Sequence, residues 1–346
     1  MANFLFRTVK REEVTDFIDV KYRNFTLTRE YIGEGCQYIE SLCTASNEIS
    51  NVYCVKAKGD TLEVENSFYF TPSDEELTEF FEFVWHHWYA VKRITFNTLL
   101  EPLQVVPQTS IHYISGVDNI AILPESFEAY LVSLGKQTCK HSKYYLGRIK
   151  RDFPSCDTVI CMNRNIRLDD YQQIVELSRQ RMEYKNKPYS GGQYEEHLYK
   201  ALKGGDDDFL RMGGGILLLV KIESKIVAGC VGFLMGENFY LSKIAHNVEY
   251  NKYNLGNIAL LETIRMCINQ DVKNFHFLWG ENVDYKKRFG GEPHPLHYHI
   301  FYKNKGYRYF YDKAKLSFSQ RINAIKNYLK NWPLLTDVYH RLIFWR

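Results

Sequence analysis

The feature that most constrains the fold is a run of three strand-like segments joined by tight turns. The segments are residues 216–222, 226–235 and 239–246, and the turns are residues 223–225 and 236–238. The first segment is strongly apolar, and the turns are built from Glu, Ser, Lys, Gly and Asn. Short polar turns between strand-like runs are typical of antiparallel hairpins. The sequence therefore predicts a three-strand antiparallel meander.

A helix and two further strands are predicted after the meander. Apolar residues recur with helical spacing from Leu255 to Ile268. Strands are expected over residues 274–279 and 295–302. The segment 280–291 between them carries Asp284, Tyr285, Lys286, Lys287 and Arg288. Connections at strand ends often carry binding and catalytic groups, although a solvated basic helix would account for the same residue types.

This order of elements, together with Asp284, Tyr285, Lys286, Phe289 and Gly290, resembles the acyl-donor half of the GNAT superfamily of N-acyltransferases. The chain is most similar to the branch of cellulose- or polysaccharide-biosynthesis acetyltransferases, which is related to the aminoacyl transferases of peptidoglycan synthesis. The basic stretch 140–151 resembles the helix that opens that domain. The resemblance covers residues 137–303 and implies acetyl-CoA or another acyl-CoA as donor substrate, with no metal.

The resemblance also implies where the donor binds. The expected donor-binding residues are Tyr253, Asn254, Leu255, Gly256 and Asn257 at the helix start, with Lys286 and Arg288 from the basic segment. N–H groups at a helix start can bind a phosphate. Many members of the superfamily have an Arg/Gln-x-x-Gly-x-Gly/Ala loop here, whereas this chain has one glycine and no arginine. Another activated acyl donor therefore stays open.

Candidate catalytic residues are His246, Asp284, Tyr285 and Lys286. An imidazole with an ordinary pKa of about 6.5 suits a base, and a tyrosine can protonate a departing thiolate. The alternatives are a histidine hydrogen-bonded at a strand end and a tyrosine packed in an aromatic core.

Acceptor binding is expected at the end of a helix that begins near Leu168. Arg181, Tyr184 and Lys187 are the candidates for binding a sugar, phosphate or carboxylate, and a solvated helix end is the alternative. His294, His297 and His299 suggest a metal site, and His297 and His299 would share one face of a strand. A third ligand with suitable spacing is not evident, so no metal site is expected.

The first part of the chain repeats the plan of the second. Strands are expected over residues 51–57 and 61–70, a helix capped by Ser73 extends to about residue 90, and a strand follows over 93–99. The fold class is therefore α/β (α+β), with two tandem GNAT-like halves, each a mixed, mainly antiparallel sheet flanked by helices, plus a C-terminal helical tail. The expected divisions are an acceptor-shaping half at 1–136, the acyl-donor domain at 137–312, and a basic aromatic tail at 313–346.

Charge is concentrated in that tail. The whole chain carries a net charge of +3, whereas residues 313–346 hold seven Lys and Arg against one Asp, a net of +6. Basic, aromatic, helix-prone segments suit an anionic membrane surface. The alternative is a helical hairpin, split at Pro333, that packs on the body.

The remaining features point to a cytoplasmic protein, with a place at the inner membrane face left open. The first residues lack the apolar core of a signal peptide, no apolar run is long enough to span a bilayer, and the eight cysteines are scattered.

We therefore predict an acyltransferase that modifies an amino or hydroxyl group of a cell-surface glycan, nucleotide sugar or lipid-linked precursor. The expected partners are the small-molecule acyl donor and this acceptor, with no DNA and with a homodimer left open. The alternatives are an aminoacyl-tRNA-dependent peptidyl transferase and a non-catalytic GNAT-like binding or resistance factor. The modest charge argues against tRNA, which favours a broad positive face.

Overall fold

The chain folds around one long mixed sheet. A computed structural model describes residues 3–10, 12–14, 17, 37–65, 67, 72–103, 109–189, 191–203, 213–235, 237–278 and 283–330. The strands are β1 (Phe4–Val9), β2 (Gln37–Cys43), β3 (Glu48–Lys58), β4 (Thr61–Val64), β5 (Arg93–Leu99), β6 (Ser110–Ile122), β7 (Asp157–Met162), β8 (Gly213–Ile222), β9 (Lys225–Met235), β10 (Asn238–His246), β11 (Asn274–His276) and β12 (Glu292–Tyr302). The α-helices are α3 (Asp74–His87), α4 (Phe127–Ser133), α5 (Lys136–Asp152), α6 (Leu168–Tyr184), α7 (Gly192–Lys203), α8 (Leu255–Asn269), α9 (Val283–Arg288) and α10 (Tyr307–Lys330), and the 3-10 turns are η2 (Asn163–Asn165) and η4 (Val248–Tyr253).

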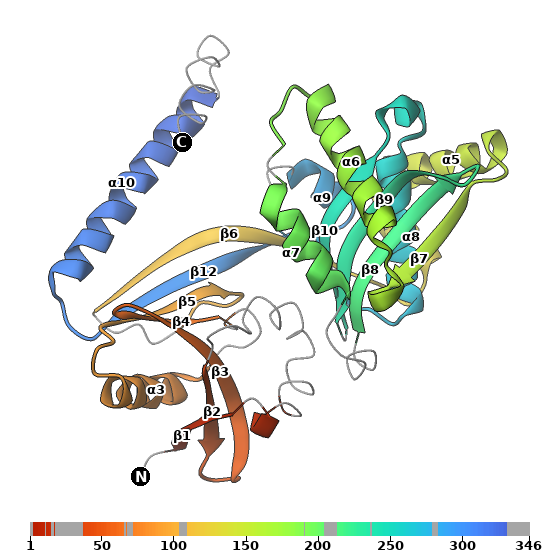
Figure 1. Ribbon diagram of the computed structural model, residues 1–346. Helices are drawn as coiled ribbons and strands as arrows, with labels where there is room; N and C mark the ends of the chain where they lie inside the picture. Colours follow the sequence, from red (N-terminus) through yellow and green to blue (C-terminus); the bar gives the residue numbers. More distant parts are fainter. Residues whose placement is uncertain are drawn as a thin grey trace.

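The sheet has twelve strands in the order β1-β2-β3-β4-β5-β12-β6-β11-β10-β9-β8-β7. Two pairs, β4 with β5 and β10 with β11, are parallel, and the other neighbours are antiparallel. Figure 1 shows the result as two lobes joined by the long strands β6 and β12. The mixed α/β fold with two related halves that we predicted from the sequence is confirmed.

Each half has the same internal plan. In the first half, β1 to β4 form an antiparallel meander, α3 follows, and β5 returns parallel to β4. In the second, β7 to β10 form the meander, α8 follows, and β11 returns parallel to β10. The local predictions hold where turn chemistry or capping is strong. Ser73, for example, caps α3 by accepting a hydrogen bond from the Glu76 N–H.

The two halves exchange their closing strands. Strand β6 follows β5 in the chain but pairs with β11 of the second half, and β12 follows the second half but pairs with β5 of the first. The two exchanged strands also pair with each other along most of their length. Each of the ranges 1–136 and 137–312 is therefore completed by a strand from the other. We propose the ranges 1–136, 137–312 and 313–346 as the acceptor-shaping half, the acyl-donor domain and the basic tail.

Helices cover both faces of the second half. On one face α4, α5 and α8 pack on β8 to β10 through a large apolar core that includes Ile216, Leu218, Phe239 and Ile264. On the other face α6 and α7 pack through a second core around Leu217, Leu219 and Ile174. Strands β8 and β9 are buried on both faces, which explains why their sequences are continuously apolar rather than alternating.

The structure differs from the sequence predictions in two places and does not describe a third. Strand β11 ends at His276 rather than Trp279, because Leu278 adopts a left-handed φ of +53° that an extended strand does not allow. The segment Gly280–Gly291 is not a simple turn, since its described part forms α9. Residues 331–346, which include the expected break at Pro333, lie outside the described residues. In the described part of the chain, no helix is long and apolar enough to cross a bilayer.

Candidate active site

The centre of the second half is a point where two parallel strands separate. Strands β10 and β11 pair from Asn238 with Asn274 to Tyr240 with His276, and no further. Strand β10 continues to His246, whereas the chain after His276 turns away. The β10 backbone edge beyond Tyr240 therefore has no β11 partner, and its N–H groups are available to a ligand carbonyl.

A β-bulge lies at the same point. The pairing of β10 with β9 shifts its register between Leu241 and Lys243, which makes Ser242 the extra residue. A bulge re-aims side chains and backbone groups, and bulges are common next to active sites. Tyr194 of α7 reaches the bulge, with its hydroxyl 2.9 Å from Ser242 Oγ.

The separation point is held by a buried polar network. His276 Nδ1 lies 2.7 Å from Asp118 Oδ2 of β6, and His276 Nε2 lies 3.2 Å from Asn238 Oδ1. The Asn274 amide donates to the same Asn238 oxygen at 3.1 Å, and the Tyr240 ring stacks on the imidazole. Asp118 and His276 are both almost fully buried. This network links the exchanged strand β6 to the end of the β10–β11 pairing.

The two central residues of the basic segment point inward from α9. Lys286 is buried and its Nζ donates to the Leu278 carbonyl. Burial lowers its pKa. The Tyr285 ring packs against Phe277 and Phe289, and its hydroxyl is buried with no hydrogen-bond partner. Burial raises the Tyr285 pKa well above its ordinary value, so the phenol keeps its proton.

The neighbouring residues of α9 face solvent. Asp284 and Arg288 are both exposed. Of the four candidate catalytic residues, the structure therefore brings Tyr285 and Lys286 inward and leaves Asp284 outside. Arg288 reaches the rim of the cavity described below.

His246 ends β10 and packs against the start of α8. A Cβ placed on Gly256 would lie 2.9 Å from His246 Nδ1, so this contact requires a residue without a side chain. Nδ1 is buried without a hydrogen-bond partner. Burial, followed by the charge of Arg181, lowers the His246 pKa to about 4, and the imidazole is neutral at physiological pH.

Cations gather beside His246 without a carboxylate to balance them. Arg181 of α6 is partly buried, and its Nη1 lies 3.5 Å from the Ile244 carbonyl. Burial lowers the Arg181 pKa, and Arg181 in turn lowers that of Lys185. Among the described residues, no carboxylate forms an ion pair with Arg181. Tyr184 and Lys187, the other two candidates for acceptor binding, are exposed.

A cavity of about 320 Å³ lies at the N-terminal end of α8. Its walls come from α5, from the start of α8 and from the end of α9, and its lining residues are Gln137, Thr138, His141, Ser142, Tyr145, Asn254, Asn257, Ile258, Leu261, Arg288 and Phe289. Three of the expected donor-binding residues, Asn254, Asn257 and Arg288, thus share one cavity. Asn254 adopts a left-handed φ of +55° directly before the helix.

The other expected donor-binding residues have different surroundings. Leu255 is fully buried in the core. Tyr253 is buried against Phe153, with the Arg148 guanidinium over its ring. These two side chains hold the helix start in place, and only their backbones are near the cavity.

A second polar group on β10 was not predicted from the sequence. Lys243 forms an ion pair with Glu195 of α7, and Tyr189 and Tyr171 donate hydrogen bonds to the same carboxylate. Burial by itself would raise the Glu195 pKa, but these three hydrogen bonds together lower it. A lysine in an apolar strand is the signal that would have pointed to this group, and a buried Asp in the strand-like stretch 110–122 is the signal for Asp118.

The three candidate metal-binding histidines do not converge. His297 and His299 stack with His112 of β6, and His112 Nε2 lies 2.9 Å from His297 Nδ1. Across the described residues, no group of three or more His, Cys, Asp or Glu side chains is arranged to hold a metal ion.

Comparison with known proteins gives a family match over this part of the chain. Residues 162–287 match the family described as an acetyltransferase (GNAT) domain. The matched range runs from the end of β7 into α9 and so contains the separation of β10 and β11, the start of α8 and Tyr285. This part of the chain therefore resembles a GNAT acetyltransferase domain, which supports an acyltransferase.

Its fold over both halves is shared with several solved structures. FemX has 10% sequence identity and a TM-score of 0.64, with 85% of this chain and 96% of that chain covered. The C-terminal domain of a putative lysylphosphatidylglycerol synthetase from Agrobacterium fabrum has 10% identity and a TM-score of 0.52 over 84% and 90%. L-PGS from Bacillus licheniformis has 11% identity and a TM-score of 0.50 over 87% and 95%. A search of curated protein sequences gave no match. The chain thus shares its two-half fold with these three structures.

Proposed function

We propose that the protein transfers an acyl group from an acyl-CoA, with acetyl-CoA as the first candidate, to an amino or hydroxyl group of an anionic acceptor. The acceptor class is a cell-surface glycan, nucleotide sugar or lipid-linked precursor. The observation that carries this proposal is the end of the β10–β11 pairing at Tyr240 and His276, with the bulge at Ser242 beside it. Strand β10 ends at His246, which contacts Gly256 in the first turn of α8, and the cavity lies at the same end of that helix.

The donor would occupy both features at once. The thioester carbonyl would accept hydrogen bonds from the β10 edge beyond Tyr240, which polarises it for attack. The phosphates would lie at the first N–H groups of α8, which have no intrahelical acceptor. Asn254, Asn257 and Arg288 line that end of the cavity. An asparagine pair and one arginine can bind a phosphate despite the missing glycine-rich loop.

The acceptor would place an anionic group between Arg181 and Lys185. A partly buried arginine without a carboxylate partner is costly unless an anion neutralises it. Tyr184 and Lys187 are placed to contact the outer part of the acceptor. Neutralising Arg181 would also remove one of the two main causes of the low His246 pKa.

In the transfer step, one residue accepts the proton of the acceptor and another donates a proton to the leaving group. The acceptor nitrogen or oxygen attacks the thioester carbon, and His246 accepts the proton that leaves the acceptor. The tetrahedral intermediate collapses, the carbon–sulfur bond breaks, and the Tyr285 hydroxyl donates its proton to the CoA thiolate. An anionic acceptor would raise the basicity of His246 on binding, toward the range that suits general-base catalysis.

Calorimetry with acetyl-CoA, followed by thiol release in the presence of charged and neutral amino sugars, tests the proposal. We expect saturable binding and turnover that prefers phosphorylated or carboxylated acceptors. Absence of binding by any acyl-CoA would overturn the choice of donor. Equal turnover of neutral and anionic acceptors would overturn the role of Arg181.

A second candidate is aminoacyl transfer. Its support is the fold shared across both halves with FemX and with two lysylphosphatidylglycerol synthetase structures, one of them putative. Turnover with aminoacyl-tRNA but not with acyl-CoA would favour it. For location we propose the cytoplasm, because the cysteines of the described chain are free thiols, a state typical of reducing compartments.

A further inference from the structure

Helix α10 is attached to the body at its beginning and projects away from it. Tyr309 is buried against Ile111, Ile300 and Tyr302 of the exchanged strands. Beyond Leu316, which is partly buried on the same cluster, Figure 1 shows the helix extending away from both lobes. A helix of 24 residues thus presents most of its described length to the surroundings.

The single carboxylate of α10 is turned toward the body. Asp312 Oδ2 lies 2.7 Å from Arg93 Nη1 and accepts a hydrogen bond from the Tyr302 hydroxyl at 2.7 Å. Arg308 on the same helix lies farther away, at 3.9 Å. Asp312 is therefore neutralised by a cation outside the helix. Residues 307–330 contain six lysines and arginines and no other Asp or Glu, so the outward charge of the helix is positive only.

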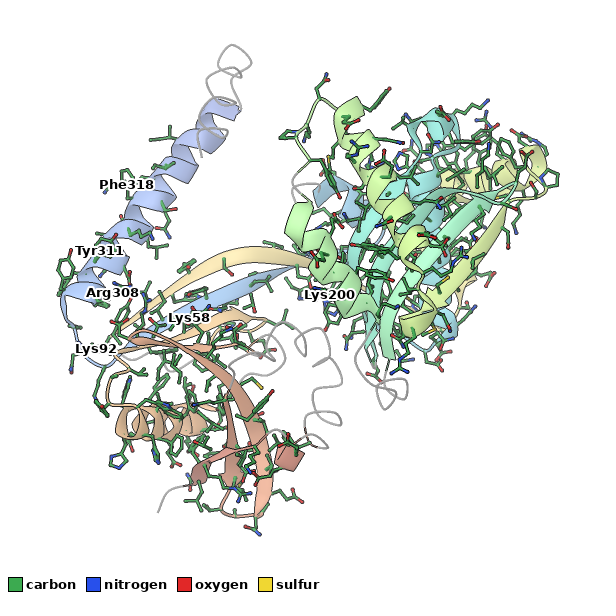
Figure 2. All side chains as sticks on the ribbon, viewed as in Figure 1. Lys58, Lys92, Lys200, Arg308, Tyr311 and Phe318 are labelled. Carbon is green, nitrogen blue, oxygen red and sulfur yellow. The ribbon has the colours of Figure 1, made fainter. Side chains whose placement is uncertain are left out.

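Apolar side chains form a stripe along the outer side of this helix. Tyr307 is 82% exposed, Tyr311 48%, Phe318 66% and Ile325 57%. Their spacings of four, seven and seven residues keep them on one face of an α-helix. Figure 2 shows Tyr311 and Phe318 on the side of α10 that faces away from the second half. An exposed stripe of this kind indicates an interaction surface.

We propose that the outer face of α10 docks on an anionic lipid bilayer, with the stripe Tyr307–Tyr311–Phe318–Ile325 in the headgroup region. Aromatic and aliphatic side chains on one face, with lysine and arginine beside them, are the pattern of helices that lie in the membrane interface. Lys315 and Arg321 flank the stripe at positions that suit lipid phosphates. The interface of a bilayer accommodates both the aromatic rings and the cations.

This docking surface does not depend on the donor or acceptor proposed above. It goes beyond the charge pattern of the tail, because only the structure turns Asp312 inward and the stripe outward. If both proposals hold, the enzyme works beside the membrane where a lipid-linked acceptor would be found.

Vesicle co-sedimentation of the full chain tests the inference. The probes are vesicles of phosphatidylcholine alone and of phosphatidylcholine with phosphatidylglycerol. We expect binding to the anionic vesicles, at least about tenfold weaker binding to the neutral ones, and release as salt screens the charges over about 8–10 Å. Binding that is absent, or equal on both vesicles, would overturn the proposal.

Matched variants distinguish vesicle binding through this face of α10 from binding through the net charge of the protein. The double variants Tyr311→Ser/Phe318→Ser and Lys313→Glu/Lys315→Glu should each lose at least about tenfold of the vesicle affinity. The control Lys200→Glu/Lys225→Glu carries the same charge change on exposed lysines of the second half and should bind as the parent does. Equal loss in the control would mean that net charge alone acts, and would overturn the proposal.

A second copy of the chain is the competing occupant. The spacings of four and seven residues in the stripe would also suit a helix pair. Light scattering of the parent protein should show a monomer. A dimer that the Tyr311→Ser/Phe318→Ser variant disrupts, together with no vesicle binding, would assign the stripe to self-association and overturn lipid docking.

Discussion

Gly256 and His246 are in direct contact: a Cβ at Gly256 would lie 2.9 Å from His246 Nδ1. The first turn of α8 and the end of β10 therefore share one packing constraint. The same glycine opens the helix start at which we place the donor phosphates. The small size of Gly256 therefore matters both for the contact with His246 and for the proposed phosphate site. Substitutions of different size can distinguish these two roles.

Gly256→Ala should displace the His246 ring and lower kcat at least about tenfold, if His246 is the base. Acyl-CoA affinity measured by calorimetry should change less, because the methyl group is directed at the imidazole. Gly147→Ala on α5 is the control, since a Cβ there meets nothing within 4 Å. Unchanged kcat in Gly256→Ala would remove His246 from the reaction. A bulkier Gly256→Val is expected to weaken donor binding as well.

Tyr285→Phe should lower turnover at least about tenfold by removing the proposed acid, while leaving the fold as stable as before or more so. The reason is that the buried hydroxyl has no hydrogen-bond partner to lose. Lys286→Met should destabilise the protein by about 1–3 kcal/mol, since the bond from Nζ to the Leu278 carbonyl is lost. Thermal unfolding and steady-state rates give both quantities. Full activity in Tyr285→Phe and in Lys286→Met would take α9 out of the active site.

Two buried histidines predict a loss of stability in mild acid. Burial, with nearby cations, lowers the His246 pKa to about 4, and burial with His112 lowers that of His299 to about 3. An unfolded histidine titrates near 6.5, so below that pH the unfolded state binds more protons than the folded state. The free energy of unfolding should therefore fall as pH drops from about 6.5 toward 4. Denaturant titrations of His299→Leu should show a shallower fall than the parent, and an identical slope would contradict the assignment.

Removal of the Asp118 carboxylate is expected to destabilise the protein, because its partner His276 is buried. Asp118→Ala removes the carboxylate that is hydrogen-bonded to the buried His276 ring and should cost about 1–3 kcal/mol of unfolding free energy. Glu176→Ala breaks an exposed pair with Arg179 at 2.8 Å and should cost no more than about 1 kcal/mol. Chemical denaturation measures both. Equal costs would show that the buried network does not hold the separation point of β10 and β11.

Arg181→Gln should weaken the binding of an anionic acceptor and leave acyl-CoA affinity unchanged. The variant also removes a cation next to His246, so the pKa of that imidazole should rise from about 4. NMR titration of the imidazole signals gives the second quantity without an identified acceptor. A His246 pKa that does not move would show that Arg181 does not influence the proposed base.

The sequence by itself determined the elements whose patterns are local. The meander of β8 to β10 follows from its turns, α8 from the spacing of Leu255 and Ile268, and the start of α3 from Ser73. These signals depend on residues a few positions apart, so the elements can be predicted without knowledge of the fold. The placement of Asn254, Asn257 and Arg288 around one cavity depended on two such local segments meeting.

The tertiary structure alone decided the arrangement between distant segments. The exchange of β6 and β12 between the halves cannot be inferred locally, because each pairing joins segments that are far apart in the chain. Asp118 meets His276 across 158 residues, and Arg93 meets Asp312 across 219. Such pairs form because the free energy of burying the whole sheet offsets the entropy cost of closing long loops. That favourable free energy comes from the assembled core rather than from any one segment.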